Sequence, residues 1–183
     1  MVNNPVFLVL DGYPKSSRLE LQAGGAGLAG ELYKKVLQQN SPCCRVDIAF
    51  SADDPSALPS EQQLTRYDGV VWTGSNLTIY HDVPEVTQQI QLSQRLFKAG
   101  IPQFGSCWAA QLAVVAAGGR CAEHPDGMEF GIARSIILTD QGRGHPLFHD
   151  KKTVFDGFIS HCDEITHLPA GAQILAGNDY TRV

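Results

Sequence analysis

The sequence predicts an α/β protein in which helices cover both faces of a mostly parallel β-sheet, giving three layers. Two observations predict this class. Short apolar runs alternate with longer segments of helical spacing as far as Gly119, which is typical of parallel sheets. The run at residues 6–10 is apolar throughout, as in strands that are buried on both faces of such a sheet. After Gly119 the segments become shorter and extended, so we also expect a smaller antiparallel element late in the chain.

Each element follows from its own pattern. Short apolar runs predict strands at 6–10, which we expect to be central, at 45–50, at 69–72 and in the run that ends at Phe104. Apolar residues at helical spacing predict helices at 24–39 and 86–98, a short helix after Ser60, and a helix that closes on Gly118. Beyond it we predict extended segments at 128–138, 153–159, 164–167 and 173–175, and one helical turn at 145–148.

Length and composition narrow the classes of function. A chain of 183 residues is long enough for one domain with a sizeable core, and we expect residues 1–183 to form one domain. The net charge of −5, without a basic cluster, argues against nucleic acid or an anionic membrane as the main partner. No apolar run reaches the ~20 residues of a membrane span and no signal peptide is recognisable, so we expect a cytoplasmic protein. The five cysteines form no CxxC pair, which suggests neither a disulfide framework nor a zinc site.

The segment 101–119 is the one around which we expect the site to be built. An apolar run is followed by two small residues, and Cys107 then opens a helical segment, so the pattern is strand, sharp turn and helix. A cysteine at such a turn is exposed above the sheet edge, and the positive end of the helix favours its thiolate. The backbone N–H of Trp108 would face an oxyanion formed on the attacked carbonyl. The alternative is that Cys107 is a small buried core residue, because free cysteine is often buried.

A second constellation lies at residues 158–164. A thiol nucleophile needs a base, and His161 is the natural candidate because it ends an apolar run with Asp163 and Glu164 close by.

Two further patterns carry less weight. Residues 25–30 have the spacing GxGxxG, but a polar segment separates them from the first strand, so we interpret them as small residues that let a helix start close to the sheet. His145 and His149 are four residues apart, yet no third ligand is evident, and we predict no metal site.

Three segments resemble class I glutamine amidotransferases. Residues 105–111 resemble the GxCxGxQ elbow of that family, with Ala109 in place of its second glycine. The turn around Gly74 resembles the strand-end SGGP turn, and residues 160–164 resemble the SHGD segment. The resemblance implies a flavodoxin-like α/β fold and no cofactor. It also implies a cysteine thioester mechanism, for which its positions are Cys107 as nucleophile, Gly74 and Trp108 as oxyanion donors, and Gln111, Ser160 and His161 as substrate-binding residues.

The resemblance differs from the residue-based reasoning about the base. In that family the base and its acid come from a later HPE segment, and no such segment occurs before Val183, so we expect a chain that lacks its C-terminal part. His161 then serves as the base only if the chain is complete. The implied function is hydrolysis of the glutamine side-chain amide, with ammonia delivered to a separate synthetase subunit. The alternatives are a γ-glutamyl hydrolase or peptidase, and an inactive binding protein with the same fold.

Overall fold

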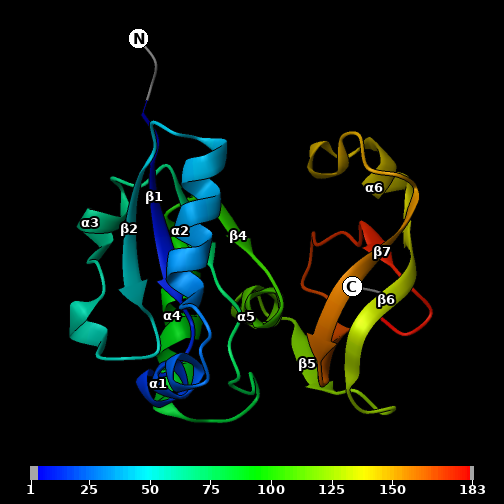
Figure 1. Ribbon diagram of the computed structural model, residues 1–183, viewed down its shortest axis with the longest axis horizontal. Helices are drawn as coiled ribbons and strands as arrows, with labels where there is room; N and C mark the ends of the chain where they lie inside the picture. The colour runs from blue at the N-terminus through cyan, green and yellow to red at the C-terminus, as the bar shows by residue number, and fades with distance from the viewer. Residues whose placement is uncertain (1–3, 182–183) are drawn as a thin grey trace. The chain divides into compact units, whose positions relative to one another are not determined.

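A computed structural model describes residues 4–181. The described chain divides into two compact units, of which the first ends at Ala116 and the second begins at Ala117. The first unit contains a parallel four-stranded sheet with the order β2-β1-β3-β4. Its strands, shown in Figure 1, are β1 (Val6–Asp11), β2 (Arg45–Phe50), β3 (Gly69–Trp72) and β4 (Gln103–Gly105).

Helices lie on both sides of this sheet, with α2 in front of it and α4 behind it in Figure 1. In chain order they are α1 (Lys15–Ala23), α2 (Ala29–Asn40), the 3₁₀ turn η1 (Pro55–Ala57), α3 (Glu61–Leu64), α4 (Pro84–Lys98) and α5 (Trp108–Ala116). The three-layer parallel α/β fold that the sequence predicts is therefore confirmed for the first unit.

The core of the first unit forms on both faces of the sheet because side chains alternate along each strand. On one face Val9, Val46 and Val71 pack together, and Tyr33 and Leu37 of α2 lie against them. The other strand positions and the inner face of α4 are also buried, at Leu8, Leu10, Val70, Trp72, Leu92 and Leu96. Strands buried on both faces explain why the run at residues 6–10 is apolar throughout.

The second unit is built from antiparallel pairs, as expected for the late part of the chain. One pair joins β5 (Arg120–Glu123) and β8 (Asp163–His167). A three-stranded sheet has β6 (Glu129–Leu138) between β7 (Val154–His161) and β9 (Ala176–Gly177). The helix α6 (Asp140–Gly144) and the 3₁₀ turn η2 (Pro146–Phe148) connect β6 to β7.

Several predicted boundaries are wrong, each for a physical reason. The helix predicted at 24–39 begins at Ala29, because Gly24 ends α1 and Gly25 has a φ of 84°. The helix α1 itself is too polar to show helical periodicity in the sequence, and β5 and α6 are too short. The last extended segment, predicted at 173–175, forms its ladder at Ala176–Gly177.

The glycines at 25–30 have the structural role that the sequence predicts. A Cβ atom at Gly30 would lie 3.0 Å from the Ile48 Cγ2 atom and 3.2 Å from an Asp11 carboxylate oxygen. The glycine therefore lets α2 start directly against the sheet. No strand leads into this segment, as a dinucleotide-binding turn would require.

Candidate active site around Cys107

Cys107 forms the connection between β4 and α5, and its backbone takes the conformation expected of an exposed nucleophile. Its φ is 58°, in the left-handed region that non-glycine residues seldom adopt, and the residue is exposed. The alternative interpretation of Cys107 as a small buried core residue requires burial, which the structure does not show. Strain of this kind is characteristic of functional sites.

The tightness of the turn is visible in how closely its two flanking residues approach. A Cβ atom at Gly105 would lie 2.6 Å from the Ala109 Cβ atom and 3.4 Å from the Trp72 Cβ atom. One methyl group fits between the strand end and the helix, and Ala109 supplies it. The departure from the GxCxGxQ pattern is thus tolerated as long as residue 105 is glycine.

Gly74 and Trp108 lie on two sides of Cys107, where the sequence places the oxyanion donors. A Cβ atom at Gly74 would be 3.6 Å from the Cys107 Cβ atom and 3.9 Å from its sulfur, so the Gly74 backbone lies against the thiol side chain. Trp108 is the first residue of α5, and the N–H groups of a first helical turn have no acceptor within the helix. The backbone of Gly74 is therefore close to the sulfur, and Trp108 follows Cys107 directly at the start of α5.

Two side chains that follow Cys107 on α5, Trp108 and Gln111, are buried. Trp108 is 2% exposed, and its indole N–H has no hydrogen-bond acceptor among residues 4–181. Gln111, one turn further along α5, is also buried. Its predicted part in substrate binding stays a prediction, as do the roles of the other residues of the site.

Two tyrosines outside the predicted site, Tyr13 and Tyr33, interact with residues of the turn. The hydroxyl of Tyr33, on α2, is hydrogen-bonded to the Ser106 hydroxyl. Burial raises the pKa of Tyr13, and the negative charges of Cys107, Asp11 and Tyr33 raise it further. Tyr13 follows the carboxyl end of β1, so the rule that ligands bind beyond the carboxyl ends of parallel strands could have drawn attention to it.

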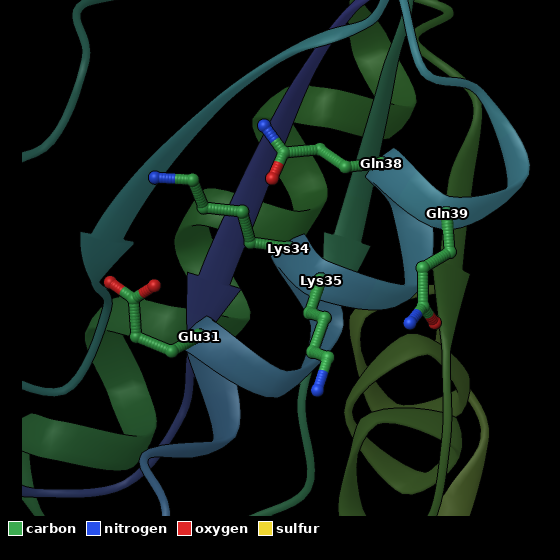
Figure 2. Close-up of a pocket in the computed structure, with 5 residues that line it drawn as sticks. All are labelled: Glu31, Lys34, Lys35, Gln38 and Gln39. Atoms are coloured by element: carbon green, nitrogen blue, oxygen red, sulfur yellow. The ribbon is translucent and has the colours of Figure 1, made fainter.

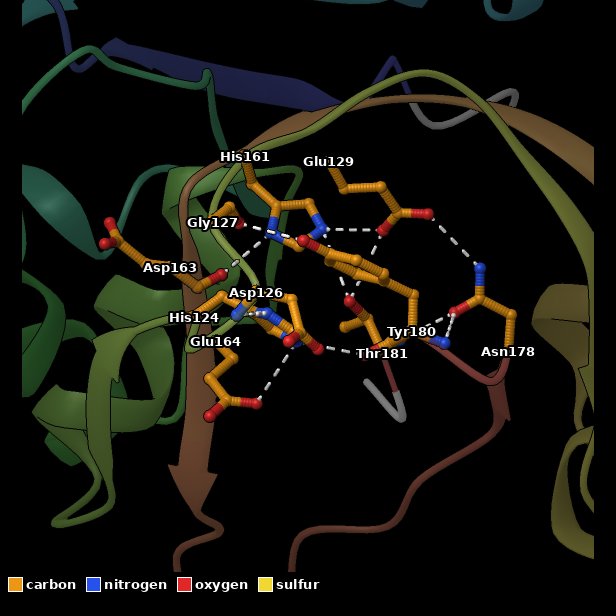
Figure 3. Close-up of polar contacts among 10 residues, drawn as sticks. All are labelled: His124, Asp126, Gly127, Glu129, His161, Asp163, Glu164, Asn178, Tyr180 and Thr181. Carbon is orange, nitrogen blue, oxygen red and sulfur yellow. Dashed lines mark hydrogen bonds and ion pairs between the residues drawn. The ribbon is translucent and has the colours of Figure 1, made fainter.

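The second unit holds His161 in a network of polar contacts, shown in Figure 3. Its Nδ1 lies 2.8 Å from the backbone carbonyl oxygen of Asp163, and its Nε2 lies 3.1 Å from a carboxylate oxygen of Glu129. The pairing of β6 with β7 places Glu129 directly opposite His161. Asn178 and Thr181 contact the same carboxylate, at 3.3 Å and 3.4 Å.

These contacts bear on whether His161 serves as a base. A carbonyl oxygen only accepts, so Nδ1 carries the proton that is donated to Asp163, and Nε2 meets an acidic oxygen of Glu129. Both ring nitrogens of His161 therefore lie against polar groups of the second unit, and its role as a base stays a prediction. Ser160 and His161 are adjacent on β7, and their side chains point to opposite faces of the strand, with Ser160 exposed.

A neighbouring group in Figure 3 is centred on His124. The ring of His124 stacks on Tyr180 with 4.2 Å between the ring centroids, and its Nε2 lies 3.1 Å from the Tyr180 carbonyl oxygen. The Tyr180 hydroxyl donates to the Gly127 carbonyl, at 3.0 Å. Residues 178–181 thus form hydrogen bonds with β6 and with the turn between β5 and β6.

Other places offer no comparable chemistry. The Nδ1 atom of His145 accepts from the Leu147 N–H, so this imidazole caps η2. Within residues 4–181, no three His, Cys, Asp or Glu side chains form a group that could hold a metal ion. A shallow depression along α2, shown in Figure 2, is lined by one helix surface only, at Glu31, Lys34, Lys35, Gln38 and Gln39. In the same described part, no helix is long and apolar enough to cross a membrane.

Comparisons with known proteins match most of the chain. A family model described as glutamine amidotransferase class-I matches residues 29–183. The chain is 38% identical over 176 residues to a γ-glutamyl-L-1-hydroxyisopropylamide hydrolase of a Pseudomonas species, covering 93% of this chain and 58% of that protein. It is 33% identical over 115 residues to a glutamine-hydrolysing GMP synthase of a Nitratiruptor species, covering 61% of this chain and 20% of the synthase. The chain therefore spans less than two thirds of either relative.

Solved structures agree on the fold. A glutamine amidotransferase from Thermotoga maritima has a TM-score of 0.72 at 17% identity, covering 97% of this chain and 69% of that one. A glutamine amidotransferase from Methylobacillus flagellatus has a TM-score of 0.72 at 17% identity, covering 97% of this chain and 63% of that one. At this level of identity the likeness concerns the α/β fold.

Proposed function

The chain belongs to the glutamine amidotransferase class-I family, and we propose on this basis that it hydrolyses γ-glutamyl amides through a thioester on Cys107. The observation that carries the proposal is the conformation of Cys107. The residue is exposed, it has a φ of 58°, and it lies between the backbone of Gly74 and the first turn of α5.

The chemistry follows from this arrangement. The Cys107 thiolate attacks the carbonyl carbon of the γ-glutamyl amide, and the N–H groups of Gly74 and Trp108 stabilise the oxyanion. The C–N bond then breaks, and the leaving nitrogen takes a proton and departs as ammonia or an amine. Water attacks the remaining thioester, which releases glutamate and restores the thiol.

In this proposal the proton of the thiol goes to a base other than His161. Both ring nitrogens of His161 already contact acceptors, namely the Asp163 carbonyl and the Glu129 carboxylate. The family resemblance implies substrate-binding roles for Gln111, Ser160 and His161, and these roles stay predictions.

The substrate that we favour is a γ-glutamyl amide with a substituent on the amide nitrogen. The supporting observation is that similarity to the hydrolase extends over 93% of this chain, whereas similarity to the GMP synthase extends over 61%. Glutamine is the second candidate, in which case a separate synthetase subunit receives the ammonia. A pocket that excludes groups larger than NH₂ would favour glutamine.

The test uses intact mass before and after exposure of the full-length protein to an electrophilic glutamine analogue at pH 8. We expect one adduct on the wild type and none on Cys107→Ser. Cys162→Ser is the matched control, because Cys162 is exposed like Cys107 but lies in the second unit, and it should keep the adduct. Cys121 should stay unmodified, because burial and the charge of Asp163 raise its pKa to about 11.

Steady-state rates on glutamine and on γ-glutamyl ethylamide then separate the two substrates. A higher kcat/KM for the ethylamide supports the substituted substrate, and a higher value for glutamine supports the amidotransferase. An adduct that persists in Cys107→Ser, or no adduct on the wild type, would overturn the thioester and favour a binding protein of the same fold.

A further inference from the structure

The helix α2 is fixed at its start by a buried carboxylate. Asp11, at the end of β1, is fully buried, and its two carboxylate oxygens accept from the backbone N–H groups of Gly30, at 2.9 Å, and Tyr13, at 3.1 Å. Gly30 is the second residue of α2, so the negative charge meets the positive end of the helix. The start of α2 is therefore held at the carboxyl ends of the parallel strands, where the turn that carries Cys107 also lies.

Tyr33 extends this anchorage to the turn itself. It lies one helical turn after Gly30, and its ring packs against the core cluster beneath α2, which contains Val9, Val46 and Val71. Its hydroxyl is hydrogen-bonded to the hydroxyl of Ser106. The phenol of Tyr33 thus connects a helix held by the core to the residue immediately before the nucleophile.

We propose that Tyr33 is a positioning residue, which acts through Ser106 to hold Cys107 in its strained conformation. This inference rests on the thioester function proposed above. A residue with a φ of 58° keeps that conformation only where its surroundings oppose relaxation. On the helix side, the N–H groups of Ala109 and Ala110 donate to the carbonyls of Ser106 and Cys107, at 3.2 Å and 2.9 Å. Tyr33 supplies the restraint from the opposite side, through the Ser106 side chain.

Tyr13 supports this view of the turn, because it shares the Asp11 carboxylate with α2. Its raised pKa keeps the phenol neutral near the Cys107 thiolate. The backbone of Tyr13 and the start of α2 are therefore held by the same carboxylate.

The test is a double-mutant cycle in the full-length protein with Tyr33→Phe and Ser106→Ala. Each single substitution removes the same hydrogen bond, so we expect each to lower kcat about 10-fold with KM unchanged. The double variant should lose no more than either single variant, because the two groups act as one unit. Alkylation of Cys107 by iodoacetamide, followed by peptide mass across pH 6–10, should slow in the same variants.

Tyr67→Phe is the matched control. The Tyr67 hydroxyl donates to Asp47 at 3.0 Å, and Asp47 lies on β2, at the opposite edge of the sheet from β4. We expect this variant to stay within about twofold of the wild type in kcat and in alkylation rate, because the Tyr67 hydroxyl bonds to Arg66 and Asp47 and to no residue of the turn at Cys107.

Wild-type kinetics in Tyr33→Phe, or additive losses in the double variant, would overturn the proposal. The alkylation rate needs no substrate. A protein with no γ-glutamyl hydrolase activity but with a slower Cys107 in Tyr33→Phe would therefore overturn the proposed function and leave the positioning role intact. Circular dichroism of each variant shows whether a loss comes from unfolding.

Discussion

The two units of the chain hold their predicted site residues by different means. In the first unit, Cys107 projects from a sheet whose inner strand β3 is buried along its whole length and whose faces are covered by helices. In the second unit, His161 lies on a strand in which half-buried and exposed positions alternate, and Phe158 of that strand is 94% exposed. The contacts of His161 are polar, and two of the side chains that support them, Asn178 and Thr181, come from the last described residues.

This difference indicates which kind of substitution should disturb the geometry of each residue. The turn at Cys107 is surrounded by apolar packing, with the hydrogen bond between Tyr33 and Ser106 beside it, so its geometry depends mainly on volume and on backbone conformation. Charge and hydrogen bonds fix His161, so its geometry depends on the protonation state of Glu129 and on the integrity of the chain around residues 178–181.

The largest contrast is expected in core stability. Leu10→Ala removes a fully buried side chain of β1 and should lower the free energy of unfolding by about 2–5 kcal/mol. Phe158→Ala removes an exposed ring and should change it by about 0.5 kcal/mol or less. Urea denaturation of both variants measures this. A cost above about 1 kcal/mol for Phe158→Ala would show that this ring is covered in solution and would weaken the comparison.

The turn at Cys107 should be sensitive to added side-chain volume rather than to a change of charge. Gly105→Ala places a methyl group 2.6 Å from the Ala109 Cβ atom, and should lower the unfolding free energy by about 1–3 kcal/mol. It should also lower kcat/KM about 100-fold, by displacing the neighbouring nucleophile. Ala109→Gly in the same chain removes the opposing methyl group and should restore most of both losses.

Gly144→Ala is the control for this substitution, because a Cβ atom at Gly144 meets nothing within 4 Å. It should change the unfolding free energy by less than about 1 kcal/mol. Failure of Ala109→Gly to rescue Gly105→Ala would show that the strand end, and not the helix, sets the fit of the turn.

The contrast between the units also explains what the sequence could predict. Buried parallel strands are continuous apolar runs, and the limits of β3 are predictable to the residue for this reason. The turn at Cys107 was predictable because the strand, the small residues and the helix are contiguous in the sequence. The partner of His161 was not, because Glu129 is opposed to it only through the register of an antiparallel pair. Tyr33 was missed because its contact with Ser106 joins residues 73 positions apart.

Disruption of the polar network should affect the second unit selectively. Glu129→Gln keeps the size of the side chain but removes the charge that contacts His161, Asn178 and Thr181. We expect the free energy of unfolding to fall by about 1–3 kcal/mol, because hydrogen bonds to a charged group in a half-buried site are lost. Hydrogen exchange should show faster exchange in residues 176–181 and β6, and unchanged protection in β1.

Asp156→Asn is the matched control in the same sheet, since the Arg134–Asp156 ion pair is exposed. Its effect should not exceed about 1 kcal/mol. Equal effects of the two substitutions would mean that the His161 network is no more important than a surface ion pair.

The smallest effect concerns Tyr13 and Tyr180, one in each unit, whose pKa values are raised partly by the charge of a cysteine. Burial and the charge of Cys107 raise the pKa of Tyr13, while burial and then the charges of Asp126, Glu129 and Cys162 raise the pKa of Tyr180. Cys107→Ser should therefore lower the pKa of Tyr13 and leave that of Tyr180 unchanged, and Cys162→Ser should do the reverse. NMR titration of ¹³C-labelled tyrosine measures both.

The sign of the effect of pH on stability follows from the raised pKa of Tyr13. As the pH rises above about 10, an unfolded tyrosine ionises first, so the free energy of unfolding falls. This fall should be smaller in Cys107→Ser, because one of the negative charges that oppose ionisation is gone. An unchanged Tyr13 titration in Cys107→Ser would mean that the phenol lies too far from the sulfur to sense its charge. The nucleophile would then be bordered by Tyr33 alone.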